Sequence, residues 1–137
     1  MSRGSMSIQP TTAANLEELG KSAWCVRECA FVIGKTRVGC ALLADDGKIY
    51  VGCNVEHRFR CHDVHAEVNA ISSMVAGGGR RIVAIVIAAE RDHFTPCGGC
   101  MDWIMQFGSG CIVAFQVRPG SELVQYTASQ LMPFYPS

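Results

Sequence analysis

The chain lacks an excess of charge of either sign. Its 12 lysines and arginines balance its 12 aspartates and glutamates, so the formal net charge at pH 7 is zero. A protein that holds a nucleic-acid backbone or an acidic membrane by electrostatics needs a basic surface, and the total does not indicate one. We therefore expect a small-molecule substrate, and neither a nucleic-acid polymer nor a membrane as partner.

Long apolar runs are also missing. No segment approaches the roughly 20 residues of a membrane-spanning helix, and no stretch of signal-peptide shape precedes the eight cysteines. We expect a cytoplasmic protein. In such a reducing compartment, a Cys-x-x-Cys pair indicates metal or redox chemistry more often than a structural disulfide.

Internal repeats and low-complexity tracts are absent, and 137 residues suit one domain better than two. We expect a single domain over residues 1–137, in which residues 1–10 are a flexible N-terminus or a remnant of cloning. The apolar share of 49% leaves room for subunit-facing surface, and therefore for an oligomer.

Hydrophobic spacing predicts an α/β fold built on a mixed five-stranded sheet. The aliphatic run 82–88 is typical of a central strand that is covered on both faces. The link between the last two strands is too short for a parallel crossover, so these strands should be antiparallel. The expected order is helix 15–34, strands 37–44 and 48–53, helix 64–75, strand 82–88, helix 95–108, and strands 111–117 and 123–127.

Helix starts and apolar stripes give further expectations. Asn15 resembles a capping residue, and the helix 64–75 should bury a stripe of valines that includes Val64 and Val75. Five cysteines lie in apolar runs and should be small buried hydrophobes, namely Cys25, Cys29, Cys40, Cys53 and Cys111.

Two short motifs supply metal ligands together with a carboxylate that the metal does not need. The first is His65-Ala66-Glu67, and the second is Thr95-Pro96-Cys97-Gly98-Gly99-Cys100. Structural zinc is usually closed by four protein ligands, whereas hydrolytic zinc keeps one position open for water. We predict that His65, Cys97 and Cys100 bind one Zn²⁺ per subunit and that Glu67 is the catalytic residue.

Two other interpretations of these cysteines stay open. Cys97 and Cys100 could form a thioredoxin-like redox pair, although the Gly-Gly between them and the partner motif make this less favoured. A closed structural zinc site could use Cys61 or His62 as its fourth ligand, since both precede His65 closely.

An open zinc position implies hydrolysis. Zinc lowers the pKa of a bound water toward about 7, and Glu67 can take the proton and pass it to a ring nitrogen and a leaving amine. This chemistry is hydrolytic deamination, and the pattern His-x-Glu followed by Pro-Cys-x-x-Cys is the known signature of zinc-dependent base deaminases.

Most of the chain resembles the cytidine deaminase family, which includes blasticidin-S deaminases. The resemblance implies a three-layer α/β/α fold and a homotetramer, or else a homodimer. The matching motifs occur in the family's order: Val38-Gly39-Cys40-Ala41-Leu42-Leu43, Asp46-Gly47, Gly52-Cys53-Asn54-Val55-Glu56, the two zinc motifs, and Leu131-Met132-Pro133.

The resemblance also implies a set of substrate-binding residues. The family positions that match Asn54 and Glu56 hold the ribose, and backbone groups at the positions of Ala66, Thr95 and Cys97 surround the pyrimidine and the departing amine. Phe134-Tyr135 resembles a C-terminal aromatic that relatives extend over a neighbouring subunit, although this tail ends early.

The chain departs from the family near the expected base pocket. Thr36 replaces an aromatic residue, and residues 57–63 replace a stretch of small residues and a tyrosine. Arg58, Arg60 and His62 could accept an anionic group on the ligand, or could pair with Asp63 and with neighbouring subunits. His57 and His93 are expected to be loop histidines rather than metal ligands.

Three hypotheses of function follow. The leading one is a zinc-dependent aminohydrolase that converts cytidine and deoxycytidine to uridine and deoxyuridine with release of ammonia. The second is a deaminase of a cytosine nucleoside antibiotic such as blasticidin S, or of another aminated heterocycle. The third, of another class, is a zinc-stabilised domain that binds a nucleoside without turnover.

Overall fold

Helices and strands alternate along the chain. The computed structural model describes residues 13–92 and 95–136, so the expectations for residues 1–10 and for His93 lie outside the described residues. The elements are α1 (Ala13–Arg27), β1 (Gly39–Ala44), β2 (Ile49–Cys53), the 3-10 helix η2 (Arg60–His62), α2 (Ala66–Ala76), β3 (Ile82–Ala88), α3 (Gly98–Gly108), β4 (Ile112–Gln116), β5 (Val124–Thr127) and α4 (Ala128–Leu131).

The strands form one sheet in the order β2-β1-β3-β4-β5. β3 is the middle strand, as its aliphatic run predicts, and it pairs parallel with β4 and antiparallel with β1. The β1–β2 and β4–β5 pairs are antiparallel. The mixed five-stranded sheet with antiparallel last strands is therefore confirmed.

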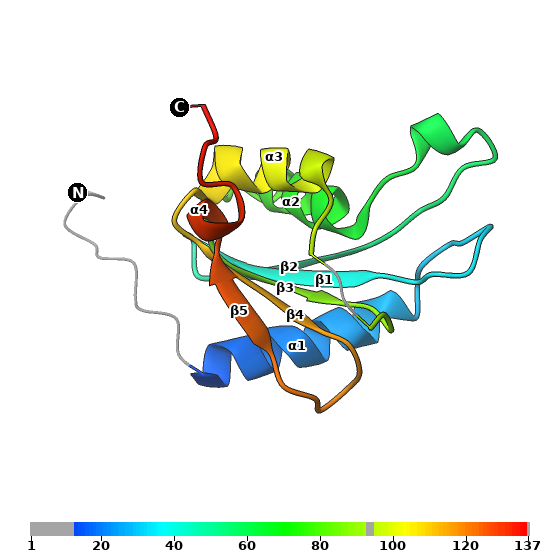
Figure 1. Ribbon diagram of the computed structural model, residues 1–137, viewed down its shortest axis with the longest axis horizontal. Helices are drawn as coiled ribbons and strands as arrows, with labels where there is room; N and C mark the ends of the chain where they lie inside the picture. The colour runs from blue at the N-terminus through cyan, green and yellow to red at the C-terminus, as the bar shows by residue number, and fades with distance from the viewer. Residues whose placement is uncertain (1–12, 93–94, 137) are drawn as a thin grey trace.

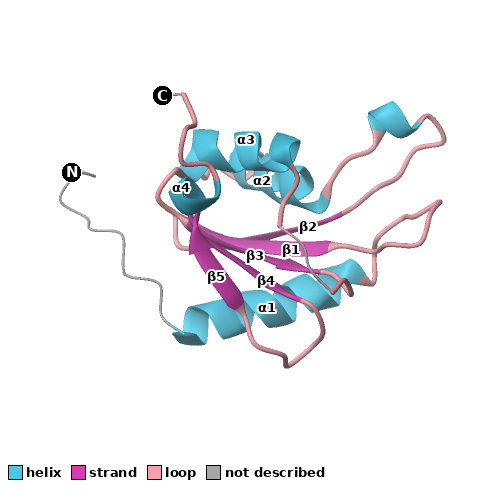
Figure 2. Ribbon diagram, viewed as in Figure 1, coloured by secondary structure: helices cyan, strands magenta, loops and turns pink. Residues whose placement is uncertain are grey.

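Helices cover both faces of this sheet, which gives three layers (Figures 1 and 2). On β3, Ala84 and Val86 point into the core beneath α1. Ile85 and Ile87 point into the opposite core, which α2 and α3 complete. This alternation follows from the two-residue period of a strand that is buried on both faces. Within the described residues, no helix is long and apolar enough to cross a bilayer.

The first helix is shorter than the sequence predicts. It ends at Arg27 rather than near Gly34, and Asn15 lies inside it rather than at its cap. The chain turns at residues 28–30, and the Phe31 N–H then donates to the Asn54 carbonyl at 3.1 Å. This bond belongs to an isolated β-bridge between Phe31 and Val55, which replaces the predicted last turns of the helix and leaves Phe31 63% exposed. The segment after α1 is thereby placed beside the end of β2.

The helix α2 is turned relative to the predicted valine stripe. Val64 and Val75 are exposed, whereas Ala70, Ile71 and Met74 are buried. The cause lies in β2, because a Cβ on Gly52 would stand only 2.4 Å from the Ala70 nitrogen. The absent side chain lets this part of the helix lie directly on the strand.

The cysteine predictions are confirmed only in part. Cys40 and Cys111 are buried and Cys53 is half-buried, but Cys25 and Cys29 are exposed. Cys25 lies on α1, whose buried side is formed by Leu16, Leu19 and Ala23, and the helical step turns position 25 away from that side. Cys29 lies in the turn that follows α1, where the predicted helix does not continue.

The structure adds α4 after the last strand, where the sequence pattern indicates only a short tail. Its first turn carries a complete capping box between Thr127 and Gln130. Beyond α4, the Tyr135 hydroxyl donates to Asp102 of α3 in the same chain. The end of the described chain is therefore attached to α3.

Candidate metal centre and its pocket

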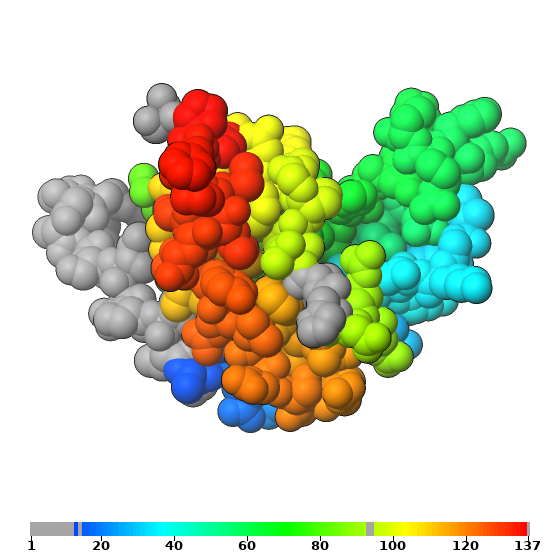
Figure 3. All heavy atoms as spheres, viewed as in Figure 1, coloured from blue at the N-terminus to red at the C-terminus, as the bar shows by residue number. Residues whose placement is uncertain are grey.

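A pocket of about 520 Å³ opens where the starts of α2 and α3 meet the end of β2. Its size is in the range typical of small-molecule sites. Figure 3 shows the surface notched between α3 and the projecting segment that contains residues 57–63. The lining residues are Thr36, Val38, Asn54, Glu56, Arg60, Asp63, Val64, His65, Ala66, Glu67, Ile87, Arg91, Thr95 and Cys97.

The three predicted zinc ligands come together at this pocket. The His65 Nδ1 atom lies 3.2 Å from the Cys100 Sγ atom and 3.4 Å from the Cys97 Sγ atom. Zinc–nitrogen and zinc–sulfur bonds of normal length at a tetrahedral angle place such atoms about 3.5 Å apart. One imidazole and two sulfurs also form a donor set that zinc prefers, so these residues fit one zinc ion.

The predicted helices 64–75 and 95–108 place all three ligands inside helices, but α2 and α3 begin later, so two of the ligands are N-caps and only Cys100 lies in a first turn. His65 is the N-cap of α2. Cys97 is the N-cap of α3, and its sulfur accepts the Cys100 N–H at 3.4 Å. A helix N-terminus favours nearby negative charge, so it suits the thiolate ligands of a metal ion.

The described residues do not support a closed four-ligand site. Cys61 and His62 lie in the exposed η2, and neither belongs to the group formed by His65, Cys97 and Cys100. The histidine beside both sulfurs also favours metal binding over a redox cysteine pair. Three protein ligands would leave a tetrahedral zinc ion one position for water, and two of them, His65 and Cys97, line the pocket.

Glu67 is the buried carboxylate of the pocket. It lies in the first turn of α2 and is only 6% exposed. Burial raises the pKa of its carboxyl above the ordinary value, while His65 partly opposes the rise. The Glu67 carboxylate is also hydrogen bonded to the Cys100 thiol and contributes to the raised pKa of that thiol, whose larger cause is burial. A buried carboxyl with a shifted pKa in a pocket is a candidate for proton transfer.

Asn54 follows β2 and connects two parts of the pocket wall. Its Oδ1 atom accepts the Val38 N–H at 2.9 Å, and its Nδ2 atom donates to the Thr36 carbonyl at 2.9 Å. These bonds fix the orientation of the amide and leave one donor hydrogen and one acceptor site for a ligand. Thr36, where the chain departs from the family, also lines the pocket.

Glu56 lies at the rim of the pocket, two residues after Asn54. Its Oε1 atom accepts the backbone N–H groups of Ile33 and Gly34 at 2.6 and 2.7 Å. These bonds lower the pKa of Glu56, and Arg60 contributes to the same effect. The predicted substrate residues Ala66 and Thr95 line the same pocket, so all eight predicted site residues lie at or directly behind it.

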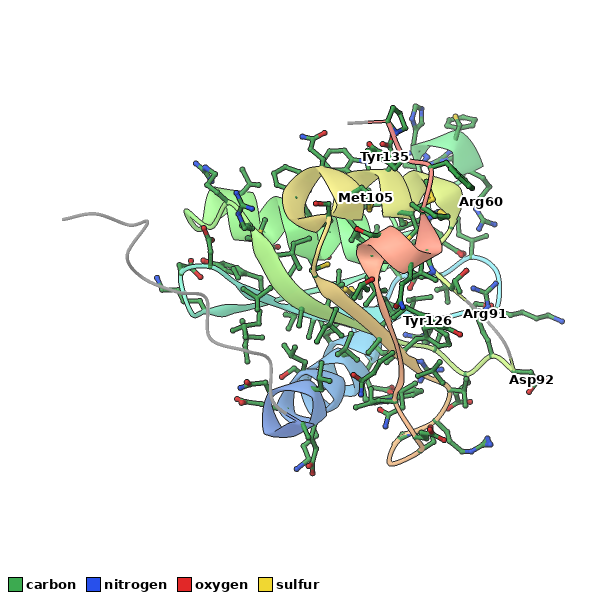
Figure 4. All side chains as sticks on the ribbon, turned by 60° about the vertical axis from the view of Figure 1, so that its left-hand side comes forward. Arg60, Arg91, Asp92, Met105, Tyr126 and Tyr135 are labelled. Atoms are coloured by element: carbon green, nitrogen blue, oxygen red, sulfur yellow. The ribbon has the colours of Figure 1, made fainter. Side chains whose placement is uncertain are left out.

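Arg60 pairs with Asp63 and Glu56, whereas Arg58 and His62 are exposed and do not line the pocket. Arg91 also lines the pocket, although it belongs to none of the sequence motifs. Its position shortly after the central strand, where ligands of α/β sheets commonly bind, is the signal that points to it. Figure 4 shows Arg60 and Arg91 on the same side of the molecule.

A sequence model described as the zinc-binding region of cytidine and deoxycytidylate deaminases matches residues 15–116. The chain is 32% identical over 121 residues to a cytidine deaminase of Sporosarcina psychrophila, and the matched region covers 87% of this chain and 89% of the relative. It is 34% identical over 99 residues to a probable cytidine deaminase of Dictyostelium discoideum, and this match covers 71% of this chain and 66% of the relative.

Solved structures agree with these matches. The crystal structure of cytidine deaminase from Burkholderia pseudomallei superposes with a TM-score of 0.79 at 28% identity, over 90% of this chain and 98% of that chain. The structure of cytidine deaminase from Mycobacterium leprae gives a TM-score of 0.74 at 29% identity, over 87% of this chain and 98% of that chain.

Proposed function

Because this chain belongs to the family of cytidine and deoxycytidylate deaminases, we propose that it hydrolyses cytidine and deoxycytidine to uridine and deoxyuridine, with release of ammonia. The family match and the His65, Cys97 and Cys100 group support zinc-dependent deamination. One observation carries the mechanism, namely the buried Glu67 carboxylate beside the sulfur of a metal ligand.

Glu67 is the proton carrier in this proposal. His65, Cys97 and Cys100 would hold the zinc ion, which would supply a water with its pKa lowered toward about 7. Glu67 takes one proton from water and delivers it to the ring nitrogen, while a new C–O bond forms at the amine-bearing carbon. It then moves the second water proton to the amine as the C–N bond breaks. Water and cytidine thus become uridine and ammonia.

The remaining predicted residues bind and orient the nucleoside. Asn54 and Glu56 face the pocket with hydrogen-bonding capacity left over, which suits sugar hydroxyl groups. Backbone groups of Ala66, Thr95 and Cys97 are assigned to the pyrimidine and the amine. Their place at the starts of α2 and α3, beside the zinc ligands, supports this assignment.

Assembly and location belong to the proposal as well. Exposed apolar side chains gather where isolated bridges join Phe31, Val55 and Val64, with Ile33 and Phe59 nearby in the chain. Such a patch is typical of a subunit contact and supports an oligomer, for which the family resemblance favours a homotetramer over a homodimer. All eight cysteines are free thiols, which favours the cytoplasm. Light scattering after size-exclusion chromatography would give the subunit number.

A substrate panel tests the proposed activity. Zinc-loaded protein is incubated separately with cytidine, deoxycytidine, cytosine and blasticidin S, and the products and ammonia are quantified. We expect conversion of cytidine and deoxycytidine, and loss of conversion in Glu67→Gln. Glu18→Gln, an identical change at an exposed position of α1, is the matched control and should keep full activity. Intact cytidine and deoxycytidine in the presence of zinc-loaded protein would refute the proposal.

A further inference from the structure

Arg60 lies between two carboxylates at the rim of the pocket. Its Nη2 atom is 3.0 Å from the Glu56 Oε2 atom, and its Nε atom donates to the Asp63 Oδ2 atom at 2.8 Å. The arginine side chain is 53% exposed, whereas the two carboxylate side chains are only 11% and 15% exposed. The guanidinium therefore covers the two acids from the solvent side.

Both carboxylates are anchored to backbone on the side away from Arg60. Glu56 accepts the Ile33 and Gly34 N–H groups, and Asp63 accepts the His57 N–H through Oδ1 at 2.7 Å. Arg60 thus connects the segment before β1 to the loop of residues 57–63. The connection is charge-assisted on both sides, which makes it stronger than a neutral hydrogen bond.

The hydrogen-bonding capacity of Glu56 limits what it can offer a ligand. A carboxylate has about four acceptor sites, two on each oxygen. Two sites on Oε1 are taken by backbone N–H groups, and one on Oε2 is taken by Arg60. One acceptor site remains on Oε2, and Glu56 and Arg60 both line the pocket.

We propose that Arg60 is a positioning residue, which holds Glu56 so that its one remaining acceptor site receives a sugar hydroxyl of the nucleoside. This inference rests on the proposed function, because it assumes a nucleoside in the pocket. Without Arg60, the Oε2 atom loses its fixed partner, and the Glu56 and Asp63 charges face each other without a cation between them. Arg60 thereby sets the preference for nucleosides that carry sugar hydroxyls.

The same contacts argue against Arg60 as the receptor of an anionic substituent. Its single positive charge already faces the two negative charges of Glu56 and Asp63, so the three side chains together carry a net negative charge. A phosphate or carboxylate on the ligand would be repelled by this group. The sequence leaves open whether Arg60 binds an anionic group of the ligand or pairs with acidic side chains, and the structure shows the pairing.

A binding experiment that needs no turnover tests the role of Arg60. Dissociation constants for cytidine and for 2′,3′-dideoxycytidine are measured by calorimetry in zinc-loaded Glu67→Gln protein, with and without Arg60→Met. We expect Arg60→Met to weaken cytidine binding roughly tenfold, since it disturbs one charged hydrogen bond, and to change dideoxycytidine binding less than twofold. Arg60→Lys keeps the positive charge but loses the planar guanidinium that can bind two carboxylates at once, so its dissociation constant for cytidine should lie between those of Arg60 and Arg60→Met. Arg58→Met is the matched control and should change neither constant.

Turnover with Glu67 intact completes the test. Arg60→Met should raise KM for cytidine by a similar factor and leave kcat within twofold, with unchanged zinc content. Equal weakening for both ligands, or no weakening for either, would overturn the role of Arg60. A protein that binds with the expected pattern but converts no cytidine would refute the proposed function and leave the role of Arg60 supported. Failure of the parent protein to bind cytidine would refute both.

Discussion

Cys97 offers one sulfur atom both to the start of a helix and to a metal. The sulfur accepts the Cys100 N–H as the N-cap of α3 and lies 3.4 Å from the His65 Nδ1 atom. At the scale of single residues, the same side chain both holds the local backbone in place and provides an atom for a metal or a ligand. Asn54 similarly fixes the Thr36 to Val38 segment and still has capacity for a ligand.

Replacing one thiol at a time tests the ligand set. Cys97→Ser should lower the zinc content from about one ion per chain to below roughly a tenth, because zinc favours thiolate over hydroxyl ligands. Cys61→Ser is the matched control, since Cys61 is an exposed thiol outside the ligand group, and it should keep full zinc. Elemental analysis of both purified variants gives the ratio. Zinc loss in Cys61→Ser would instead indicate a closed four-ligand site.

The lowered pKa of Glu56 implies that the stability of the fold depends on pH. Its backbone hydrogen bonds and Arg60 lower its pKa in the folded state, so its contribution is fully present above the unfolded value of about 4.3. The contribution is lost as the pH falls through the lower folded pKa. The difference in melting temperature between the parent protein and Glu56→Gln should therefore be largest near pH 6 and shrink below about pH 4. A difference that grows on acidification would contradict this account.

At the scale of elements, glycines set how closely the helices approach the sheet. A Cβ on Gly52 of β2 would stand 2.4 Å from the Ala70 nitrogen and 2.7 Å from the Ala66 carbonyl of α2. This close approach sets the rotation of α2 and therefore the direction in which Glu67 points. The strand β2 and the Glu67 carboxylate are coupled through this backbone contact.

Substitution of this glycine should be costly. Gly52→Ala is expected to lower the free energy of unfolding by about 1–3 kcal/mol, the usual cost of overpacking, and to reduce cytidine turnover because α2 must shift. Gly110→Ala is the matched control, since its added Cβ would meet nothing within 4 Å. Urea denaturation of the two variants measures the difference. Equal stability of both variants would show that β2 and α2 are not in such close contact.

The elements also show how far the sequence can predict this fold. The aliphatic run Ile82–Ala88 identifies the central strand because apolar residues on both faces require cover on both faces. The end of α1 and the rotation of α2 are not predictable in this way. They depend on tertiary contacts, namely the bridge from Phe31 to Val55 and the approach of Gly52 to Ala70.

The residues of the site likewise fall into those that the sequence predicts and those that only the fold reveals. His65, Glu67, Cys97 and Cys100 are recognisable because zinc hydrolysis requires those side chains in short motifs. Arg91 is isolated in the sequence and lines the pocket only because β3 brings it there. The pairing of Arg60 with two carboxylates also requires the fold of residues 57–63 to be known.

At the scale of the whole molecule, zinc should connect activity with stability. The ligands come from two helix starts that are distant in sequence, so a bound ion joins α2 to α3. Ligands that bind only the folded state stabilise it by mass action. Chelation should therefore abolish cytidine turnover and lower the melting temperature by several degrees, roughly 3–4 °C per kcal/mol lost. Added zinc should restore both, and a melting temperature insensitive to zinc would contradict this coupling.

The central claim is that water replaces the amino group of cytidine at this zinc site through Glu67. Incubation of cytidine with zinc-loaded protein in ¹⁸O-labelled water, followed by mass spectrometry, tests it most directly. We predict uridine that carries one ¹⁸O atom, together with an equal amount of ammonia, and a rate roughly a hundredfold to ten-thousandfold lower in Glu67→Gln at equal zinc content. Unchanged cytidine in the zinc-loaded parent protein, or an equal rate in Glu67→Gln, would contradict the claim.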